Sequence, residues 1–173
     1  MAAAPQAQMT DVEAIDWLVG FDTTSAKSNL PLIHAVADYL AGHGAAIRKI
    51  PDETGTKANL FATFGPSEPG GIVLSGHSDV VPVEGQPWTS DPFTMVERAG
   101  GLYGRGTTDM KGFIGCAVAL APEISAIPLR QPIHIALSYD EEVGCVGVRP
   151  LIDLIGRELP RPALAIVGEP TEM

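Results

Sequence analysis

Histidine and carboxylate side chains follow three short apolar segments of this sequence. In chain order they are His77 and Asp79 after residues 72–75, Glu141 and Glu142 after residues 133–139, and Glu169 after residues 163–167. Each apolar segment has the length and composition of a buried parallel strand. In open α/β sheets, ligands bind outside the carboxyl ends of the strands. We therefore expect these side chains to meet in one crevice.

Such a crevice needs cations. Carboxylates that lie close together raise one another's pKa, and burial raises it further. Asp109, after the glycine-rich residues 104–108, adds another acid, while the basic residues nearby are only Arg105 and Lys111. A mixed set of imidazole and carboxylate ligands suits zinc, cobalt or manganese better than calcium. A catalytic zinc site also leaves one position open for water.

The spacing of the acids predicts a division of roles. His77 and Asp79 are two residues apart, so in an extended segment they face the same side, and Asp79 could orient the imidazole. Glu141 and Glu142 are adjacent and should point apart, so that one binds a metal while the other acts as a general base. Taken alone, each pattern is also typical of a surface histidine beside a solvated aspartate, or of a charged turn.

Other residues with reactive side chains are interpreted as structural. Residues 104–112 lack the spacing of either common phosphate-binding glycine motif. The remaining candidates have no partner at ligand spacing, or lie in apolar segments; they are His34, His43, His134, Cys116 and Cys145. Both cysteines are expected to be small core residues, and two cysteines form no disulfide framework, which indicates a reducing compartment.

The elements that must position the acids follow from apolar periodicity and turn residues. Helices are predicted over 10–19, 30–40, 110–120 (ended by Pro122) and 148–159, strands over 45–50, 59–64, 72–75, 133–139 and 163–167, and a small hairpin over 94–104. Trp88 and Phe93 are expected to pack the intervening loop over the sheet. This order predicts an α/β fold with a mixed, mostly parallel sheet and helices on both faces.

Length and composition limit the class of protein. The 173 residues suit one domain, and 45% hydrophobic with 18% charged residues is an ordinary globular balance. The formal net charge of −10 argues against nucleic acid or an anionic membrane as partner. The sequence shows neither a secretory signal nor an apolar run long enough to span a membrane, so we expect a cytoplasmic protein.

Four segments resemble the metal-ligand motifs of the acetylornithine deacetylase and succinyl-diaminopimelate desuccinylase family of metallohydrolases. They are SGHSDVVPVEGQPWTSDPF, LYGRGTTDMKGF, SYDEEVGCVGVRPLI and IVGEPTEM. The segments VPVEGQPWTSDPF and DEEVGC are closer to the acetylornithine deacetylase branch. The resemblance extends from the first helix to Met173 and implies a zinc-aminopeptidase-like catalytic domain.

The resemblance implies a role for each matched residue. His77 and Glu169 would bind one metal, Asp109 would bridge two, and Glu142 would bind the second. Asp79 would orient His77, and Glu141 would be the general base. The implied cofactor is zinc, with two divalent ions in the complete enzyme and cobalt as a possible substitute. The implied reaction is hydrolysis of N-acetyl-ornithine to ornithine and acetate in arginine biosynthesis.

Family members are much longer, so residues 1–173 are expected to be a truncated, partial catalytic domain. The absent parts would be an inserted domain, through which the complete enzyme forms a homodimer, and a later half that supplies a last histidine ligand. Without that histidine the second metal would bind poorly, and the fragment alone is expected to be nearly inactive.

Three hypotheses remain open from the sequence. The first is the deacetylase, acting on a small N-acyl amino acid. The second is a desuccinylase, aminoacylase or dipeptidase of the same family. The third is a non-catalytic metal-binding fragment, for which replacing Glu141 would change nothing measurable.

Overall fold

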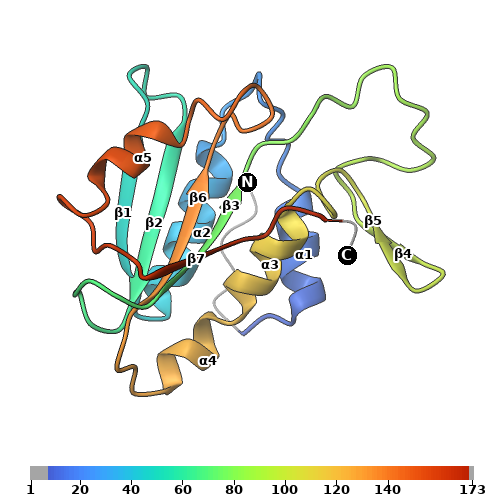
Figure 1. The fold of residues 1–173 in the computed structure, drawn as a ribbon. Coiled ribbons are helices and arrows are strands. Elements are labelled where there is room, and N and C mark those ends of the chain that lie inside the picture. Colours follow the sequence, from blue (N-terminus) through green and yellow to red (C-terminus); the bar gives the residue numbers. More distant parts are fainter. Residues whose placement is uncertain (1–7, 172–173) are drawn as a thin grey trace.

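The computed structural model describes residues 8–171 and contains a five-stranded sheet with helices on both faces (Figure 1). The strands of this sheet lie in the order β1-β2-β6-β3-β7. Their bounds are β1 Ala46–Pro51, β2 Ala58–Phe64, β3 Ile72–His77, β6 Ile133–Ser138 and β7 Leu164–Val167. The helices are α1 Asp11–Val19, α2 Leu30–Gly42, α3 Lys111–Ala119, α4 Ala121–Ala126 and α5 Arg149–Leu154.

The sheet is mixed, and most of its strands run in the same direction. β2 pairs antiparallel with both β1 and β6, whereas β3 pairs parallel with both β6 and β7. Strands β1, β3, β6 and β7 therefore share one direction and β2 opposes them. This confirms the predicted fold class, and it brings the carboxyl ends of β3, β6 and β7 to one edge.

Alternating side chains on the strands build two cores. On one face Leu60, Ile135 and Leu137 join a large apolar cluster with α1, α2, α3 and α4. On the other face Phe61 and Ala136 join a smaller cluster with Leu151 and Leu154 of α5, Ile50 and Val73. Because successive strand side chains point to opposite faces, β2 and β6 contribute to both cores and are covered on both sides.

Local signals in the sequence account for several boundaries. Thr10 and Glu13 form a capping box at the start of α1: the backbone N–H of Glu13 donates to Thr10 Oγ1 at 3.3 Å, and the backbone N–H of Thr10 donates to Glu13 Oε2 at 2.8 Å. The hairpin forms from β4 Val96–Arg98 and β5 Gly101–Tyr103, with positive φ at Ala99 and Gly100, as a tight two-residue turn requires.

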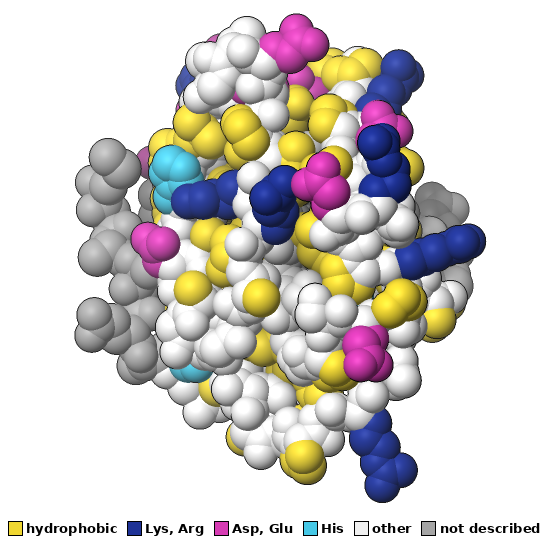
Figure 2. All heavy atoms as spheres, turned by 90° about the vertical axis from the view of Figure 1, so that its left-hand side faces the viewer, with side chains coloured by type: hydrophobic (Ala, Val, Ile, Leu, Met, Phe, Trp, Pro, Cys, Tyr) yellow, Lys and Arg dark blue, Asp and Glu magenta, His cyan; other side chains and the backbone are white. Residues whose placement is uncertain are grey.

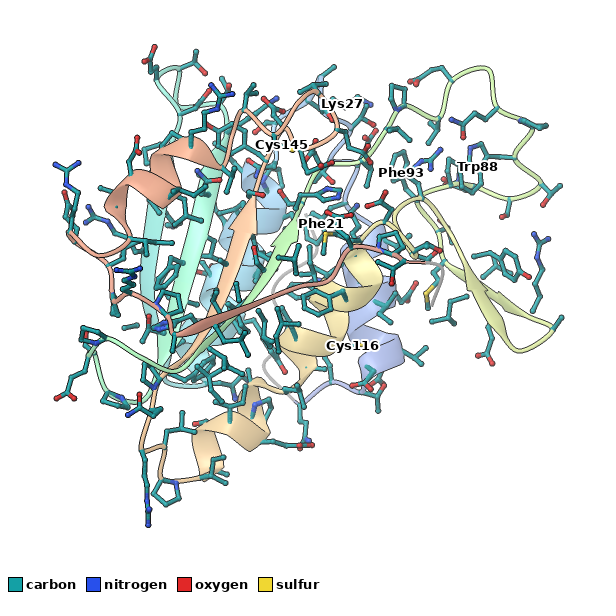
Figure 3. The ribbon with its side chains drawn as sticks, in the orientation of Figure 1. Phe21, Lys27, Trp88, Phe93, Cys116 and Cys145 are labelled. Atoms are coloured by element: carbon teal, nitrogen blue, oxygen red, sulfur yellow. The ribbon has the colours of Figure 1, made fainter. Side chains whose placement is uncertain are left out.

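Some sequence-based expectations need correction. Pro122 lies in the first turn of the short helix α4 instead of only ending α3, because proline fits the first turn of a helix, where its missing N–H is not needed. α5 ends at Leu154, and residues 155–159 form turns instead of continuing the helix to 159. Trp88 does not pack over the sheet as expected, because it lies in a loop that extends away from the sheet (Figure 3). The guanidinium carbon of Arg105 lies 5.1 Å from the centre of the Trp88 ring.

The surface and the edge of the sheet add two observations. On the side of the molecule that is at the left of Figure 1, basic, acidic and apolar side chains are interspersed (Figure 2). The edge strand β7 leaves Leu164, Ile166 and Val167 exposed. Within residues 8–171, no helix is long and apolar enough to cross a membrane.

Candidate metal centre

His77 ends β3 and lies at the centre of the acidic residues. Its side chain is 1% exposed, and its Nε2 is 2.9 Å from Asp109 Oδ1, 3.6 Å from Glu169 Oε1 and 3.8 Å from Glu141 Oε2. The other ring nitrogen, Nδ1, is 2.9 Å from the backbone carbonyl of Asp79. If Nδ1 carries the proton, it donates to this carbonyl and leaves the lone pair of Nε2 directed at the carboxylates.

The register of the sheet explains why Glu169 reaches His77. Ser75 of β3 is paired with Val167 of β7, so the residues two positions further on, His77 and Glu169, lie side by side. The backbone N–H of Gly168 also donates to the carbonyl of Ser75 at 3.2 Å. A Cβ atom at Gly168 would lie 2.0 Å from the ring of Phe113, so only glycine lets the chain approach α3 this closely.

Two groups of three side chains have ligand atoms within 4.8 Å of one another. The first is His77, Glu141 and Glu169, and the second is His77, Asp109 and Glu142. Both groups share His77. Asp109 comes from the loop before α3, and its peptide bond to Met110 is cis. Together the two groups contain five of the six site residues predicted from the sequence, and within each group the side chains are close enough to bind the same metal ion.

Asp79, the sixth residue, is buried, and its carboxylate contacts the backbone of the other acids more closely than it contacts His77. Its Oδ1 is 3.5 Å from His77 Nδ1, so the expected orientation of His77 comes mainly through the Asp79 carbonyl. Its carboxylate instead accepts hydrogen bonds from the backbone N–H groups of Glu141 at 3.1 Å and Glu142 at 3.3 Å. The hydroxyl of Ser25 donates to the same carboxylate at 2.7 Å.

The pKa values at the site reflect burial and crowding of like charges. Burial and the charge of Asp109 raise the pKa of Glu142. Burial also raises the pKa of Glu169, and the charges of Asp109 and Glu141 add to this. Burial opposes the charged form of Asp79, yet hydrogen bonds from His77, Ser25 and the Glu141 amide lower its pKa. A cation between these side chains would relieve their repulsion.

Two lysines have contacts that the sequence analysis did not predict. Lys111 is fully buried, and its Nζ donates to the backbone carbonyl of Phe21, so it does not neutralise the acids. Lys57, which precedes β2, forms an ion pair with Asp140. Sequence reasoning missed Lys57 because its partner is 83 residues away and only the sheet order brings the two together.

Neither cysteine is a core residue, which corrects the sequence-based expectation. Both are free and exposed. Cys116 lies on α3, whereas Cys145 lies in the loop after β6 (Figure 3). The Cys145 thiol donates to Glu141 Oε1 at 3.2 Å. Cys145 and Glu141 line a cavity of about 290 Å³ together with His77, Glu169, Val148 and Val167.

These donors fit a divalent metal ion. One imidazole nitrogen, held by a hydrogen bond at the opposite nitrogen, and several carboxylates within 4.8 Å are the ligands that zinc and related ions take. Residues His77, Asp109, Glu142 and Glu169 could hold such ions. Glu141 borders the cavity and could act on a molecule inside it.

We expect the metal-free protein to lose stability as the pH rises through 9. Burial favours neutral His77, but the hydrogen bonds and charge of Asp79 and the hydrogen bond of Asp109 raise its pKa from 6.5 to about 9. A raised folded-state pKa gives stability that is complete below 6.5 and lost as the pH rises through 9, at most roughly 3 kcal/mol. Urea unfolding of the metal-free protein at pH 6 to 10 measures this, and a His77→Asn variant with the same pH dependence would contradict it.

The sequence and the fold both match known proteins. The family model described as Peptidase family M20/M25/M40 matches residues 73–173. The chain is 40% identical over 154 residues to an acetylornithine deacetylase of Proteus mirabilis strain HI4320, covering 88% of the chain and 38% of that protein. It is 39% identical over 154 residues to an acetylornithine deacetylase of Photorhabdus laumondii. The chain thus spans less than two fifths of the length of these relatives.

Solved structures share the fold. An M20 family metallo-carboxypeptidase of Sulfolobus solfataricus matches 92% of the chain and 37% of its own length, with a TM-score of 0.76 and 16% identity. Human carnosine dipeptidase 1 matches 83% of the chain and 34% of its own length, with a TM-score of 0.68 and 26% identity.

Proposed function

The chain belongs to peptidase family M20/M25/M40, and from that premise we propose that it forms part of the catalytic domain of a metal-dependent amide hydrolase. One observation carries the proposal: His77 Nε2 lies within 3.8 Å of carboxylates from three separate segments, those of Asp109, Glu141 and Glu169. Carboxylates held this close together repel one another unless a cation lies between them, and such clusters are typical of functional sites.

We propose that His77, Asp109 and Glu169 hold one divalent ion and that Asp109 and Glu142 hold a second. Zinc is the proposed ion, and cobalt has the same ligand preferences here. Bound ions would polarise the amide carbonyl and lower the pKa of an attacking water molecule. By distance alone, Glu141 could also be a metal ligand, because its carboxylate lies in one group with His77 and Glu169. Glu141 is nevertheless proposed as the base, because it borders the cavity in which a substrate would sit.

The chain's own residues then account for the proton transfers. Glu141 removes a proton from the water whose oxygen bonds to the acyl carbon. It returns the proton to the amine nitrogen when the C–N bond breaks, giving a carboxylic acid and an amine, and a second proton then passes from the acid to the amine to leave a carboxylate and an ammonium group. Asp79 positions Glu141 by accepting a hydrogen bond from its backbone amide at 3.1 Å.

The proposed substrate is a small N-acyl amino acid, most specifically N-acetyl-ornithine, which would place the protein in arginine biosynthesis in the cytoplasm. The support is the name shared by relatives that are 40% and 39% identical. A dipeptide is the second candidate substrate, because human carnosine dipeptidase 1 is 26% identical to the chain. Comparing kcat/KM for N-acetyl-ornithine, N-succinyl-diaminopimelate and carnosine tests the choice, and a preference for either of the others would overturn it.

We further propose that the remaining length of the relatives supplies another metal ligand and a surface for homodimer formation. The support is that the chain covers 38% of the relative from Proteus mirabilis. Residues 1–173 alone are then expected to bind about one zinc per chain with little turnover, whereas the full-length protein binds about two. Elemental analysis and acetate release measure this, and two tightly bound zinc ions with full activity in residues 1–173 would refute it.

A further inference from the structure

We propose that Lys57 is a positioning residue for this site: it fixes the turn that carries Glu141 and Glu142 by holding Asp140, the residue before them. The inference rests on the proposed function, because it assigns Lys57 a part in metal binding and turnover. It names a contact that lies outside the four ligands and the base.

Lys57 holds two segments at once. Its Nζ donates to Asp140 Oδ1 and to the backbone carbonyl of Ser25. The side chains of Lys57 and Asp140 are each 17% exposed, so solvent and salt screen this ion pair less than a surface pair. The Lys57 ammonium is also 5.9 Å from the centre of the ring of Tyr139, the residue that follows β6. The lysine therefore connects the start of β2 with the end of β6.

The same contacts continue to the metal ligands. Ser25, whose carbonyl accepts from Lys57, donates its hydroxyl to Asp79 Oδ2 at 2.7 Å. Asp79 in turn accepts from the backbone amides of Glu141 and Glu142. Three consecutive residues are thus fixed by one network, Asp140 through its side chain and the two glutamates through their backbone.

The backbone of this turn needs such support. Asp140 has φ of 56°, in the left-handed region that a residue with a side chain seldom adopts. Aspartate tolerates this region better than most residues, but the conformation persists only where surrounding contacts hold it. Asn59 adds a further contact by donating to the carbonyl of Gly147 at 2.9 Å, so the turn is held at both ends.

The test is Lys57→Met in the full-length protein, with zinc affinity measured by competition against a chromophoric chelator. Methionine keeps an unbranched side chain that is one atom shorter, and it removes both hydrogen bonds. Loss of a partner behind the metal ligands costs about 10- to 100-fold in metal affinity, and that weakening is expected here. Lys57→Arg should restore part of it. Lys27→Met is the matched control, because Lys27 pairs with Asp22 in an exposed ion pair, and it should leave the affinity unchanged.

Turnover gives the second readout. With zinc saturating, we expect Lys57→Met to lower kcat at least tenfold while KM for the N-acyl substrate stays within threefold. Asp140→Asn should reproduce both effects, and it serves in place of Lys57→Met if the methionine variant does not fold. The positioning role would be wrong if a folded Lys57→Met variant kept both its zinc affinity and its kcat within threefold of the unmodified protein. Lys57 would then form only a structural ion pair.

The two proposals fail in different ways. If Lys57→Met weakens zinc binding but the unmodified protein hydrolyses no N-acyl substrate or dipeptide, the positioning role stands and the proposed function is wrong. If the unmodified protein is active and Lys57→Met changes only its melting temperature, the function stands and the positioning role is wrong.

Discussion

Replacing Glu141 by glutamine is expected to lower kcat by about 10²- to 10⁴-fold in the full-length protein, with zinc content unchanged. The amide is nearly the same size as the carboxylate but cannot accept the proton of the attacking water. Its oxygen can still accept the hydrogen bond from the Cys145 thiol. The loop should therefore keep its shape, and the loss should reflect the missing base.

Steady-state kinetics together with elemental analysis checks this expectation. Glu158→Gln is a suitable control, because Glu158 pairs with Arg48 at the surface, with side chains 55% and 54% exposed. A Glu141→Gln variant that loses zinc in step with activity would make Glu141 a metal ligand, as its grouping with His77 and Glu169 allows. A variant with full activity would support the non-catalytic alternative.

Replacing His77 by alanine should weaken zinc binding strongly, because His77 is the one imidazole in the proposed ligand set. His77 belongs to both groups of closely spaced ligand atoms, and in the proposed ligand set it binds the first ion together with Asp109 and Glu169. It also leaves the carboxylates of Asp109, Glu141 and Glu169 without the imidazole that they now approach. We expect zinc affinity to fall by more than roughly 100-fold, beyond the 10- to 100-fold typical of a partner behind the ligands.

Two comparisons make this result interpretable. Asp79→Asn should fall within the smaller range, because Asp79 acts through other residues. His34→Ala should bind zinc as the unmodified protein does, since His34 is an exposed residue of α2. Retention of both zinc ions by the folded His77→Ala variant would exclude the proposed ligand set.

The sequence predicted the fold class and the meeting of the acids because both depend on regular features. The apolar strands before His77, Glu141 and Glu169 are short and continuous, and parallel strands place their carboxyl ends at one edge. The convergence therefore follows from strand type alone. The roles assigned to the individual acids remain predictions, since they depend on a metal and a substrate.

The features that the sequence did not predict depend on contacts between distant segments. The hydrogen bond from Ser25 to Asp79 joins residues 54 positions apart, and no local pattern marks either as a partner of the other. Likewise, the exposure of Cys116 and Cys145 could not be inferred from their usual burial. The early end of α5 has a local cause in Gly156, which has φ of 80°.

The parallel pairing of β3 with β7 has a consequence for how the protein folds. Glu169 follows the last strand, whereas His77 ends the third, so a long loop must close before the two meet. Closing long loops costs entropy before any contact compensates for it, and folds with many distant contacts form slowly. The centre should therefore be among the last parts of the native state to form, and the rate at which zinc becomes bound during refolding should report the docking of β7.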